Sequence, residues 1–453
     1  MTALFQSLSE LLEKVEVTQK SLEIIAQTAN YLKTLSAEEV EPATNMMVGI
    51  PKIQLKSTRR QLVNPHPHKR PQNPEEASTI GQVREIYDRQ FRNKGNTTAA
   101  NREAVKVDEA EKKGFAKEFY SRQTILKELG EKGQQKLAKS KVAVVGAGGL
   151  GTVSSLYLAL AGVGYIRLID QDTIETHNLH RQILYNPDDL HYPKTEVAAK
   201  RLEKQNPLVT VEAVPENVNA DNVERLLKGV DCVVDGLDNM VTRYLVNRAC
   251  VKLKIPYVFG AAIGIEGNLS VFAPPETGCL ECLMPNLSDF DLLSCNTRGV
   301  LGATTGIIGA LQAMETIKLL SGVGSTLKGK LMVCDFSDID FTVIDISKST
   351  RCPVCHGEIS SIAGGERLVW LCGKDTANIN PEKPLKLNLD EVYPQVSRQF
   401  NVRLKSRLAL MFDYKSCEVS FFSGGRMLIK GVTDEKTALT VYREILKKLE
   451  SST

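Results

Sequence analysis

The sequence has almost no net charge of either sign, because its 57 lysines and arginines nearly balance its 54 aspartates and glutamates and leave +3 over 453 residues. Chains dedicated to nucleic acid or to anionic membrane surfaces are usually strongly basic, so this balance supports neither class. With 42% hydrophobic and 25% charged residues, the composition also excludes collagen-like, wholly disordered and small disulfide-stapled proteins. It is typical of a soluble protein of about two to four domains.

The N-terminal apolar run MTALFQSLSELLEKVEV does not predict a signal peptide, because it contains acids and follows no basic segment. One stretch without charges, Val142–Ile166, is long enough to span a membrane. Six glycines interrupt this stretch, however, and favour a strand, a turn, a helix and a second strand. We therefore expect a cytoplasmic protein, whose ten cysteines are thiols or metal ligands rather than disulfides.

Composition and periodicity divide the chain into four parts. Residues 1–50 follow a helical apolar period and predict a helical module. Residues 51–113 begin with a basic run, are rich in proline and polar residues, and predict a linker. Residues 114–357 alternate apolar strands with helices, which indicates an α/β fold with a doubly wound, mainly parallel, Rossmann-like sheet. Residues 358–453 predict a small α+β C-terminal domain.

The third part contains five expected strands, and these are Val142–Val145, Ile166–Ile169, Thr210–Val214, Cys232–Val234 and Tyr257–Phe259. The expected helices of this part are Leu150–Ala161, Thr195–Gln205, Val241–Leu253 and the long apolar Leu301–Leu320. In the last part three strands are expected at Arg407–Phe412, Glu418–Phe422 and Arg426–Ile429. A final helix is expected at Glu435–Leu449.

A glycine-rich loop, GAGGLG, follows the strand KVAVV and opens the next helix. Its glycines, Gly146, Gly148, Gly149 and Gly151, allow a tight turn and a close approach of phosphate to the start of the helix. Asp170 follows the next strand at about twenty residues from the loop, where an acid would bind the ribose of a nucleotide. The pattern predicts a nucleotide site, and a glycine turn without a ligand is the alternative.

A dehydrogenase that uses NAD would carry the same loop, but the residues that follow favour a different chemistry. Asn178, Arg181 and Lys194 come after the second strand, and Asp238 and Arg243 come after the fourth. Cations beside a glycine loop suit a triphosphate, and a carboxylate such as Asp238 can hold Mg²⁺. Alternatively, such cations are surface ion-pair partners and Asp238 caps the helix that follows.

Several ordered segments resemble the MoeB/ThiF/HesA family, whose members are related to the adenylation domains of ubiquitin-activating enzymes. The resemblance covers about residues 115–357 and rests on YSRQTILKELGEKGQQKL, VAVVGAGGLG, LIDQDTIETHNLHRQ, PKTEVAAKRLEKQNP, VVDGLDNMVTRYLVN and GVLGATTGIIGALQAMETIKLL. It implies a homodimeric enzyme that uses ATP and Mg²⁺ to adenylate the C-terminal glycine of a small ubiquitin-fold protein ending in Gly-Gly. The activated protein would then take part in sulfur transfer or thioester formation.

The resemblance also implies roles for individual residues. Asp170 matches the acid that binds the ribose, and Asp238 matches the essential acid associated with Mg²⁺ and ATP. Arg122, in the YSRQ motif, matches an arginine that reaches the phosphates of the neighbouring subunit in family homodimers. The residues that match the surroundings of the triphosphate are Asn178, Arg181 and Lys194.

Two CxxC pairs are typical of a metal site. They consist of Cys279 with Cys282 and Cys352 with Cys355. Four thiolates from two such turns suit one Zn²⁺ in a closed tetrahedron, and the family carries the same two pairs. Because a closed site leaves no position for water, its expected role is structural, and a redox role of either pair is the alternative.

One further cysteine, Cys295, is a candidate nucleophile. It lies in the polar segment SCNTRGVLG, where exposure, Arg298 and the start of the next helix would favour a reactive thiolate. In the family, the cysteine at this position takes part in covalent or sulfur-transfer chemistry in some members and is not required in others. The cysteines expected in the core are Cys232, Cys250 and Cys334.

Three alternative functions stay open at the level of sequence. One is a minimal ubiquitin-type activating enzyme that feeds a conjugation pathway. The lack of a large separate cysteine domain between Lys194 and Leu301 opposes a full-length activator of that kind but not a minimal one. The others are an NAD-dependent dehydrogenase and a non-catalytic adapter that recruits partners through the N-terminal helices. The basic run within residues 52–70 has no interleaved aromatic residues, so nucleic acid is not an expected partner.

Overall fold

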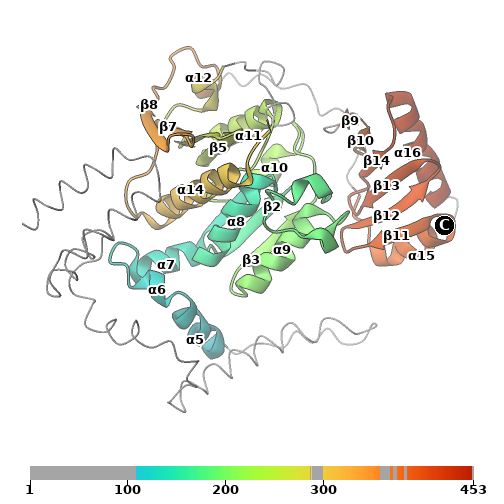
Figure 1. The fold of residues 1–453 in the computed structure, drawn as a ribbon, viewed down its shortest axis with the longest axis horizontal. Helices are drawn as coiled ribbons and strands as arrows, with labels where there is room; N and C mark the ends of the chain where they lie inside the picture. Colours follow the sequence, from blue (N-terminus) through green and yellow to red (C-terminus); the bar gives the residue numbers. More distant parts are fainter. Residues whose placement is uncertain are drawn as a thin grey trace, which may run out of the picture. The chain divides into compact units, whose positions relative to one another are not determined.

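The computed structural model describes residues 109–285, 287, 299–357, 368–370, 375–381 and 385–450. The expected helical module, most of the expected linker and Cys295 lie outside these residues. The described residues form two β-sheets, each with its own helices and hydrophobic core (Figure 1).

The larger sheet has eight strands in the order β3-β2-β1-β4-β5-β6-β7-β8. Pairing is parallel from β3 to β5 and antiparallel from β5 to β8. The five expected strands are confirmed as β1 (Lys141–Val145), β2 (Tyr165–Ile169), β3 (Thr210–Val214), β4 (Cys232–Asp235) and β5 (Tyr257–Ile263). The antiparallel extension was not expected and consists of β6 (Glu266–Phe272), β7 (Lys330–Asp335) and β8 (Asp340–Asp345).

Helices cover both faces of this sheet, as a doubly wound fold requires (Figure 1). Along β1, Val142 and Val144 pack with one set of helices, while Ala143 and Val145 pack with the other. The first set is α7 (Gly130–Lys139), α8 (Gly149–Ala161), α9 (Lys194–Gln205) and α14 (Gly302–Ser321). The second set is α10 (Val223–Leu227) and α11 (Met240–Leu253). Burial on both faces explains why β1 is a continuous apolar run.

The uncharged stretch Val142–Ile166 comprises most of β1, the whole of α8 and the start of β2. Gly162 ends α8 in the left-handed conformation at φ 89°, which glycine adopts without steric cost. In the part of the chain that the structure describes, no helix is long and apolar enough to cross a membrane.

The helix α5 (Glu109–Phe119) begins inside the span where a linker is expected, and it is followed by the short α6 (Ser121–Thr124). The sequence of α5, EAEKKGFAKEF, consists mainly of strong helix formers, which outweigh its single glycine. At its end the rings of Phe115 and Phe119 stack with centroids 5.3 Å apart, and the ring of Tyr120 meets that of Phe119 edge to face at 5.1 Å. Residues 109–113, which were expected in the linker, are therefore helical.

The second sheet has six strands in the order β11-β12-β13-β14-β10-β9, and its strand pairs are antiparallel. The expected elements are confirmed as β12 (Ala409–Tyr414), β13 (Cys417–Phe422), β14 (Met427–Lys430) and α16 (Glu435–Glu450). Further elements were not expected, and these are β9 (Leu368–Trp370), β10 (Thr376–Ile379), α15 (Leu389–Gln399) and β11 (Asn401–Lys405). We call this sheet with its two helices the C-terminal unit.

The helices α8 and α14 pack closely because small residues line their contact. A Cβ atom placed on Gly309 of α14 would lie 2.7 Å from the carbonyl oxygen of Leu150, which opens α8. By contrast, a Cβ atom on Gly306, one turn earlier in α14, would have no neighbour within 4 Å. Gly309 therefore sets the distance between the two helices, whereas Gly306 does not.

This difference gives a matched pair of variants. Gly309→Ala is expected to lower the free energy of unfolding by about 1–3 kcal/mol, because the new methyl group overpacks the contact. Gly306→Ala adds the same methyl group in the same helix and is expected to raise the stability by up to about 1 kcal/mol. Urea denaturation of both variants measures the two changes, and a loss of equal size in each would contradict the packing described.

Candidate functional site

The glycine loop lies where the order of strands reverses. Since β1 pairs with β2 on one side and β4 on the other, the chain leaves the sheet in opposite directions at the carboxyl ends of β1 and β4. Open α/β sheets bind ligands in the crevice at such a point. A Cβ atom on Gly146 would lie 2.4 Å from the carbonyl oxygen of Gly236, and one on Gly151 would lie 1.8 Å from the carbonyl oxygen of Gly146. Only glycine fits at either position.

The start of α8 is suited to an anion. Gly148 is the N-cap residue, and no side chain caps the first turn, so its N–H groups are available to a phosphate. The side chain of Gln182 approaches this point, because a Cβ atom on Gly148 would lie 3.9 Å from its Nε2. Gln182 is buried and its Oε1 has no hydrogen-bond partner. Sequence reasoning gave no role to Gln182, since a glutamine beside an arginine carries no signal by itself.

Asp170 lies beside the glycine loop, as expected. Its Oδ2 accepts a hydrogen bond of 2.7 Å from the N–H of Ala147, and its Oδ1 accepts one of 2.7 Å from the N–H of Asp172. Burial raises the pKa of Asp170, whereas Lys194 acts in the opposite direction. The carboxylate thus joins the loop after β1 to the loop after β2.

Lys194 is a buried cation in the same place. Its Nζ lies 2.9 Å from Oδ2 of Asp172. Burial alone would lower the pKa of Lys194, but the attraction of Asp172, Asp170 and Asp238 outweighs burial and raises it above its usual value. The ammonium group is therefore charged at neutral pH, among acids that follow β2 and β4.

Asn178 and Arg181 stabilise the segment after β2. Asn178 is buried in a 3₁₀ turn, where its Oδ1 accepts a hydrogen bond of 3.0 Å from the N–H of Glu175. Arg181 is half-buried, and its Nη1 donates to the carbonyl oxygen of His177 at 2.7 Å. Within the described ranges no carboxylate lies at ion-pair distance from Arg181, so the structure does not show it as a surface ion-pair partner.

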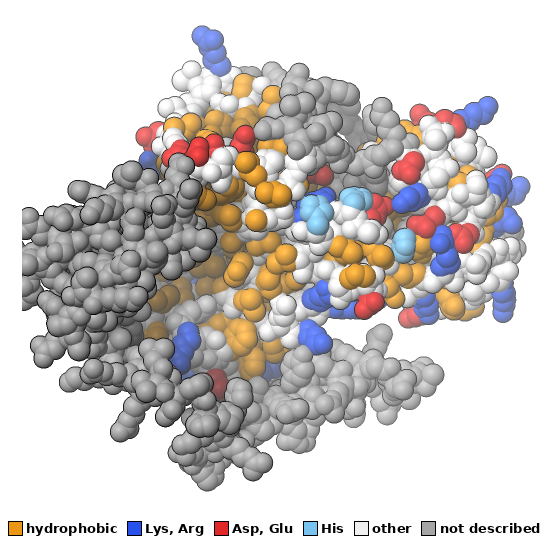
Figure 2. Space-filling view, in the orientation of Figure 1, with side chains coloured by type: hydrophobic (Ala, Val, Ile, Leu, Met, Phe, Trp, Pro, Cys, Tyr) orange, Lys and Arg blue, Asp and Glu red, His pale blue; other side chains and the backbone are white. Residues whose placement is uncertain are grey.

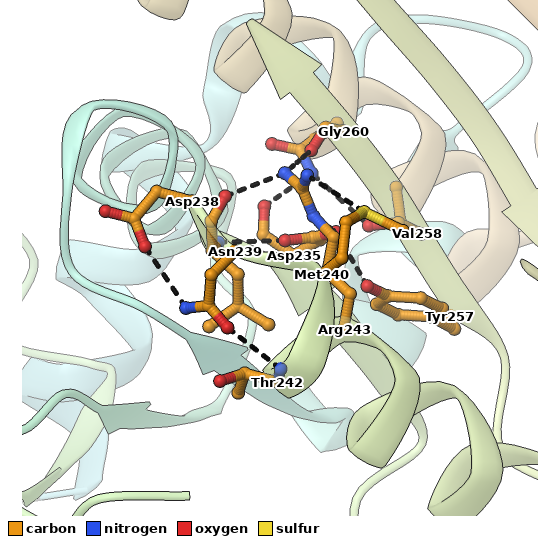
Figure 3. A network of polar contacts seen from close by, with 11 residues as sticks. Asp235, Asp238, Asn239, Met240, Thr242, Arg243, Tyr257, Val258 and Gly260 are labelled. Carbon is orange, nitrogen blue, oxygen red and sulfur yellow. Dashed lines mark hydrogen bonds and ion pairs between the residues drawn. The ribbon is translucent and has the colours of Figure 1, made fainter. Parts of the chain in front are cut away.

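Arg243 belongs to the core rather than to a phosphate site (Figure 3). Its Nε lies 3.0 Å from Oδ2 of Asp235, and the same oxygen accepts a hydrogen bond of 2.6 Å from the hydroxyl of Tyr257. Its Nη2 donates to the carbonyl oxygens of Leu237 at 2.7 Å and Gly260 at 3.0 Å. Burial raises the pKa of Asp235, although Arg243 and its hydrogen bonds oppose this. The network fixes the turn after β4.

Asp238 lies on that turn but outside the network. It is exposed, and Figure 3 shows its carboxylate directed away from Arg243, with Nδ2 of Asn239 at 3.3 Å. Asn239 is the residue that caps α11, because its Oδ1 accepts a hydrogen bond of 2.9 Å from the N–H of Thr242. The alternative in which Asp238 caps the helix is therefore wrong, and its carboxylate is open to a ligand.

The four cysteines of the two CxxC pairs come together. Their sulfur atoms all lie within 4.8 Å of one another, with Cys279 to Cys352 at 3.7 Å and Cys282 to Cys355 at 3.5 Å. A tetrahedron with Zn–S bonds of about 2.3 Å has S···S distances of about 3.8 Å, so these residues fit Zn²⁺. Burial raises the pKa of Cys279 to about 11, whereas hydrogen bonds to Cys282 outweigh burial and lower its pKa. A bound cation would favour the thiolate form of all four cysteines.

The remaining candidates are Arg122, for which the described part of the structure shows no contact with these residues, and Cys295, together with three cysteines expected in the core. Arg122 is exposed on α6, and the described residues give its side chain no hydrogen-bond partner. Cys295 is not described, so its role stays a prediction from sequence. The three cysteines expected in the core are buried, and these are Cys232, Cys250 and Cys334.

A glycine loop at the reversal of strand order, with the carboxylate of Asp170 and the buried Lys194 beside it, is the arrangement of an α/β fold of the nucleotide-binding type. The sequence profile of the ThiF family matches residues 120–354, and the chain belongs to this family. The resemblance to MoeB, ThiF and HesA proteins is thereby confirmed.

Three relatives show how much of the chain the similarity covers. The sulfur carrier protein adenylyltransferase of Thermus thermophilus is 43% identical over 245 residues, which are 53% of this chain and 90% of that protein. The sulfur carrier protein ThiS adenylyltransferase of Escherichia coli is 41% identical over 239 residues, which are 52% of this chain and 94% of that protein. The SAMP-activating enzyme E1 of Haloferax volcanii is 41% identical over 245 residues, which are 54% of this chain and 90% of that protein.

The Asp235 network predicts a large cost for a single substitution. Arg243→Met leaves the carboxylate of Asp235 buried without its cation, so the free energy of unfolding is expected to fall by about 3–5 kcal/mol. The control is Arg225→Met, which breaks an exposed ion pair with Glu216 and is expected to cost at most about 1 kcal/mol. Urea denaturation measures the free energy of unfolding of both variants. An equal loss in each would contradict a stabilising role of the buried Asp235–Arg243 ion pair.

Proposed function

We propose that the chain uses ATP to adenylate the C-terminal glycine carboxylate of a small ubiquitin-fold protein. The observation that carries the proposal is the crevice at the carboxyl ends of β1, β2 and β4, where the uncapped start of α8, the charged Lys194 and three acids converge. A chain of the ThiF family with relatives named as adenylyltransferases is expected to use such a crevice for ATP.

The reaction needs positioning and charge more than proton transfer. A glycine carboxylate is already ionised, so it attacks the α-phosphorus without a general base, an O–P bond forms, and pyrophosphate leaves as the bond to the β-phosphate breaks. We assign the ribose to Asp170 and the triphosphate to the start of α8 together with Asn178, Arg181 and Lys194. Asp238 is the residue proposed to hold Mg²⁺, which would neutralise phosphate charge when bound.

The acyl-adenylate is then proposed to react with a sulfur nucleophile, which displaces AMP from the acyl carbon. Cys295 is the thiol that the sequence offers for this step, and a sulfur donor outside the chain is the other source. The names of the relatives, two sulfur carrier adenylyltransferases and a SAMP-activating enzyme, support a protein carrier as the partner. Sulfur transfer and modifier activation therefore share the first step proposed here.

Exposed apolar side chains offer surfaces for protein partners. On the edge strand β8, Phe341, Val343 and Ile344 are exposed, which is unusual for a strand that ends a sheet. A second set, Tyr157, Ile307 and Met314, lies on α8 and α14, and Figure 2 shows hydrophobic side chains gathered over these helices. We propose that the first surface receives the carrier.

The surface on α8 and α14 is proposed to form a homodimer. Arg122, which is exposed and unpaired within the described ranges, would then be available to the phosphates of the neighbouring subunit. We also propose a cytoplasmic enzyme, since the four clustered thiols need a reducing compartment to bind metal rather than to form disulfides. The cluster is proposed to hold one Zn²⁺ with a structural role.

Loss of the Asp238 carboxylate tests the proposed chemistry. Asp238→Ala is expected to lower the exchange of labelled pyrophosphate into ATP, with the carrier present, by at least about 100-fold. Its stability is expected to stay within about 0.5 kcal/mol of the wild type, because the side chain is exposed.

Asp231→Ala is the matched control, because Asp231 is an exposed acid just before the opposite end of β4. It is expected to exchange pyrophosphate at the wild-type rate. Exchange at the wild-type rate in Asp238→Ala would refute the role of Asp238, and a wild-type chain that never exchanges pyrophosphate would refute the proposed adenylation.

The cysteine cluster predicts metal content and stability together. The full chain, purified without chelator, is expected to contain about one Zn²⁺, and Cys282→Ser is expected to lose it with a fall in Tm of about 5 °C or more. Cys334→Ala, which removes a buried thiol outside the cluster, is expected to keep the metal. Elemental analysis decides this, and a wild-type chain without zinc would contradict the proposed site.

A further inference from the structure

The C-terminal unit makes a direct contact with the nucleotide crevice through Arg426. This arginine precedes β14, and its Nη2 donates a hydrogen bond of 2.6 Å to the carbonyl oxygen of Gln171. Gln171 lies between Asp170, proposed to bind the ribose, and Asp172, the partner of Lys194. The contact therefore restrains the short segment that joins Asp170 to Asp172.

Asn378 of β10 completes a closed set of hydrogen bonds. Its Nδ2 donates to Oε1 of Gln171 at 3.1 Å, and its Oδ1 accepts from Nη1 of Arg426 at 3.1 Å. Asn378 is fully buried, and Arg426 is 4% exposed. Gln171 is thus held by its main chain and its side chain at once, which restrains it more than a single surface contact would.

A second contact holds the other side of the crevice. Glu196 is buried in the first turn of α9, two residues after Lys194. Its two carboxylate oxygens accept hydrogen bonds of 3.2 Å and 3.1 Å from the N–H groups of Arg407 and Leu408. The C-terminal unit is therefore attached to both segments that supply the Asp172–Lys194 ion pair.

The burial of Arg426 is not explained by stability alone. Its guanidinium lies 3.6 Å from the ring centroid of Phe422, its Nε has no hydrogen-bond partner, and no described carboxylate lies within ion-pair distance. Burial lowers its pKa to about 10, against the attraction of Asp172, Asp170 and Glu216. An unpaired buried cation costs free energy, so a role in the neighbouring crevice is the better account of its position.

We propose that Arg426 is a positioning residue of the nucleotide site, which holds Gln171 so that Asp170 and the Asp172–Lys194 pair are set in place for ATP. The C-terminal unit then contributes to ATP binding by supporting the ATP site. This inference rests on the proposed adenylation, because ATP is the nucleotide it concerns.

The test uses the full chain with ATP and Mg²⁺. Arg426→Met is expected to raise both the Kd of ATP, measured by calorimetry, and the KM for ATP in pyrophosphate exchange by about tenfold, which corresponds to about 1.4 kcal/mol. Its kcat is expected to stay within about twofold, because every side chain assigned to the phosphates is still present and the lost restraint acts on the binding of ATP. Arg426→Lys is expected to recover part of the affinity, because an ammonium group can still donate to the carbonyl oxygen of Gln171.

The control is Lys405→Met, whose ion pair with Asp390 lies wholly within the C-terminal unit, and it is expected to bind ATP as the wild type does. If Arg426→Met does not fold, Gln171→Leu takes its place, because it removes only the hydrogen bond from Asn378. We expect Gln171→Leu to weaken ATP binding by about threefold, as loss of one hydrogen bond predicts, and to speed amide hydrogen exchange at residues 170–173.

Wild-type ATP affinity in the folded Arg426→Met variant, or in Gln171→Leu where it replaces that variant, would overturn the inference. A kcat that falls while the Kd and KM stay unchanged would also overturn it. A wild-type chain that binds ATP but exchanges no pyrophosphate would refute the proposed adenylation, while the comparison of ATP affinities would still decide the role of Arg426. A wild-type chain that binds no ATP would overturn both.

Discussion

The turns that follow β1 and β4 touch through their backbones, and a single methyl group on Gly146 or Gly236 would push them apart. The N–H of Gly236 donates to the carbonyl oxygen of Val145 at 2.7 Å, which fixes the contact. Asp235, at the end of β4, binds Arg243 through its carboxylate. The main-chain carbonyl oxygen of Asp235 accepts a hydrogen bond of 2.7 Å from Gln312 of α14. This close approach fixes the position of the start of α8 relative to the turn that carries Asp238.

The crevice is supported from a second direction by the C-terminal unit. Arg426 and Asn378 bind Gln171 in the segment that follows β2. The N–H of Arg407, in the turn before β12, donates to Glu196 at the start of α9. The family match ends at residue 354, and the three relatives described align with 52%, 53% and 54% of the chain. The chain thus combines a site built from family motifs with a support that lies beyond the matched region.

Much of the core and of the crevice follows from local sequence. Strands buried on both faces are continuous apolar runs, and the glycine loop and CxxC pairs carry their own spacing signals. The exposed β8 has no such signal, and α15 contains Pro394, a residue that disfavours the interior of a helix. The segment DGLDN does not reveal which of its acids is buried, because Arg243 and Tyr257, the partners of Asp235, lie outside it on α11 and β5. The contact between Arg426 and Gln171 is equally hidden, since it joins residues far apart in sequence.

The central proposed step is the attack of a carrier carboxylate on the α-phosphorus of ATP. Its most direct test is a carrier labelled with ¹⁸O in its C-terminal carboxylate, incubated with the full chain, ATP, Mg²⁺ and a thiol acceptor. Because the bridging oxygen of an acyl-adenylate leaves with the nucleotide when sulfur attacks the acyl carbon, the released AMP is predicted to contain one ¹⁸O atom. Release of unlabelled AMP, or of ADP, would show that water or a different phosphate reacts and would contradict the account.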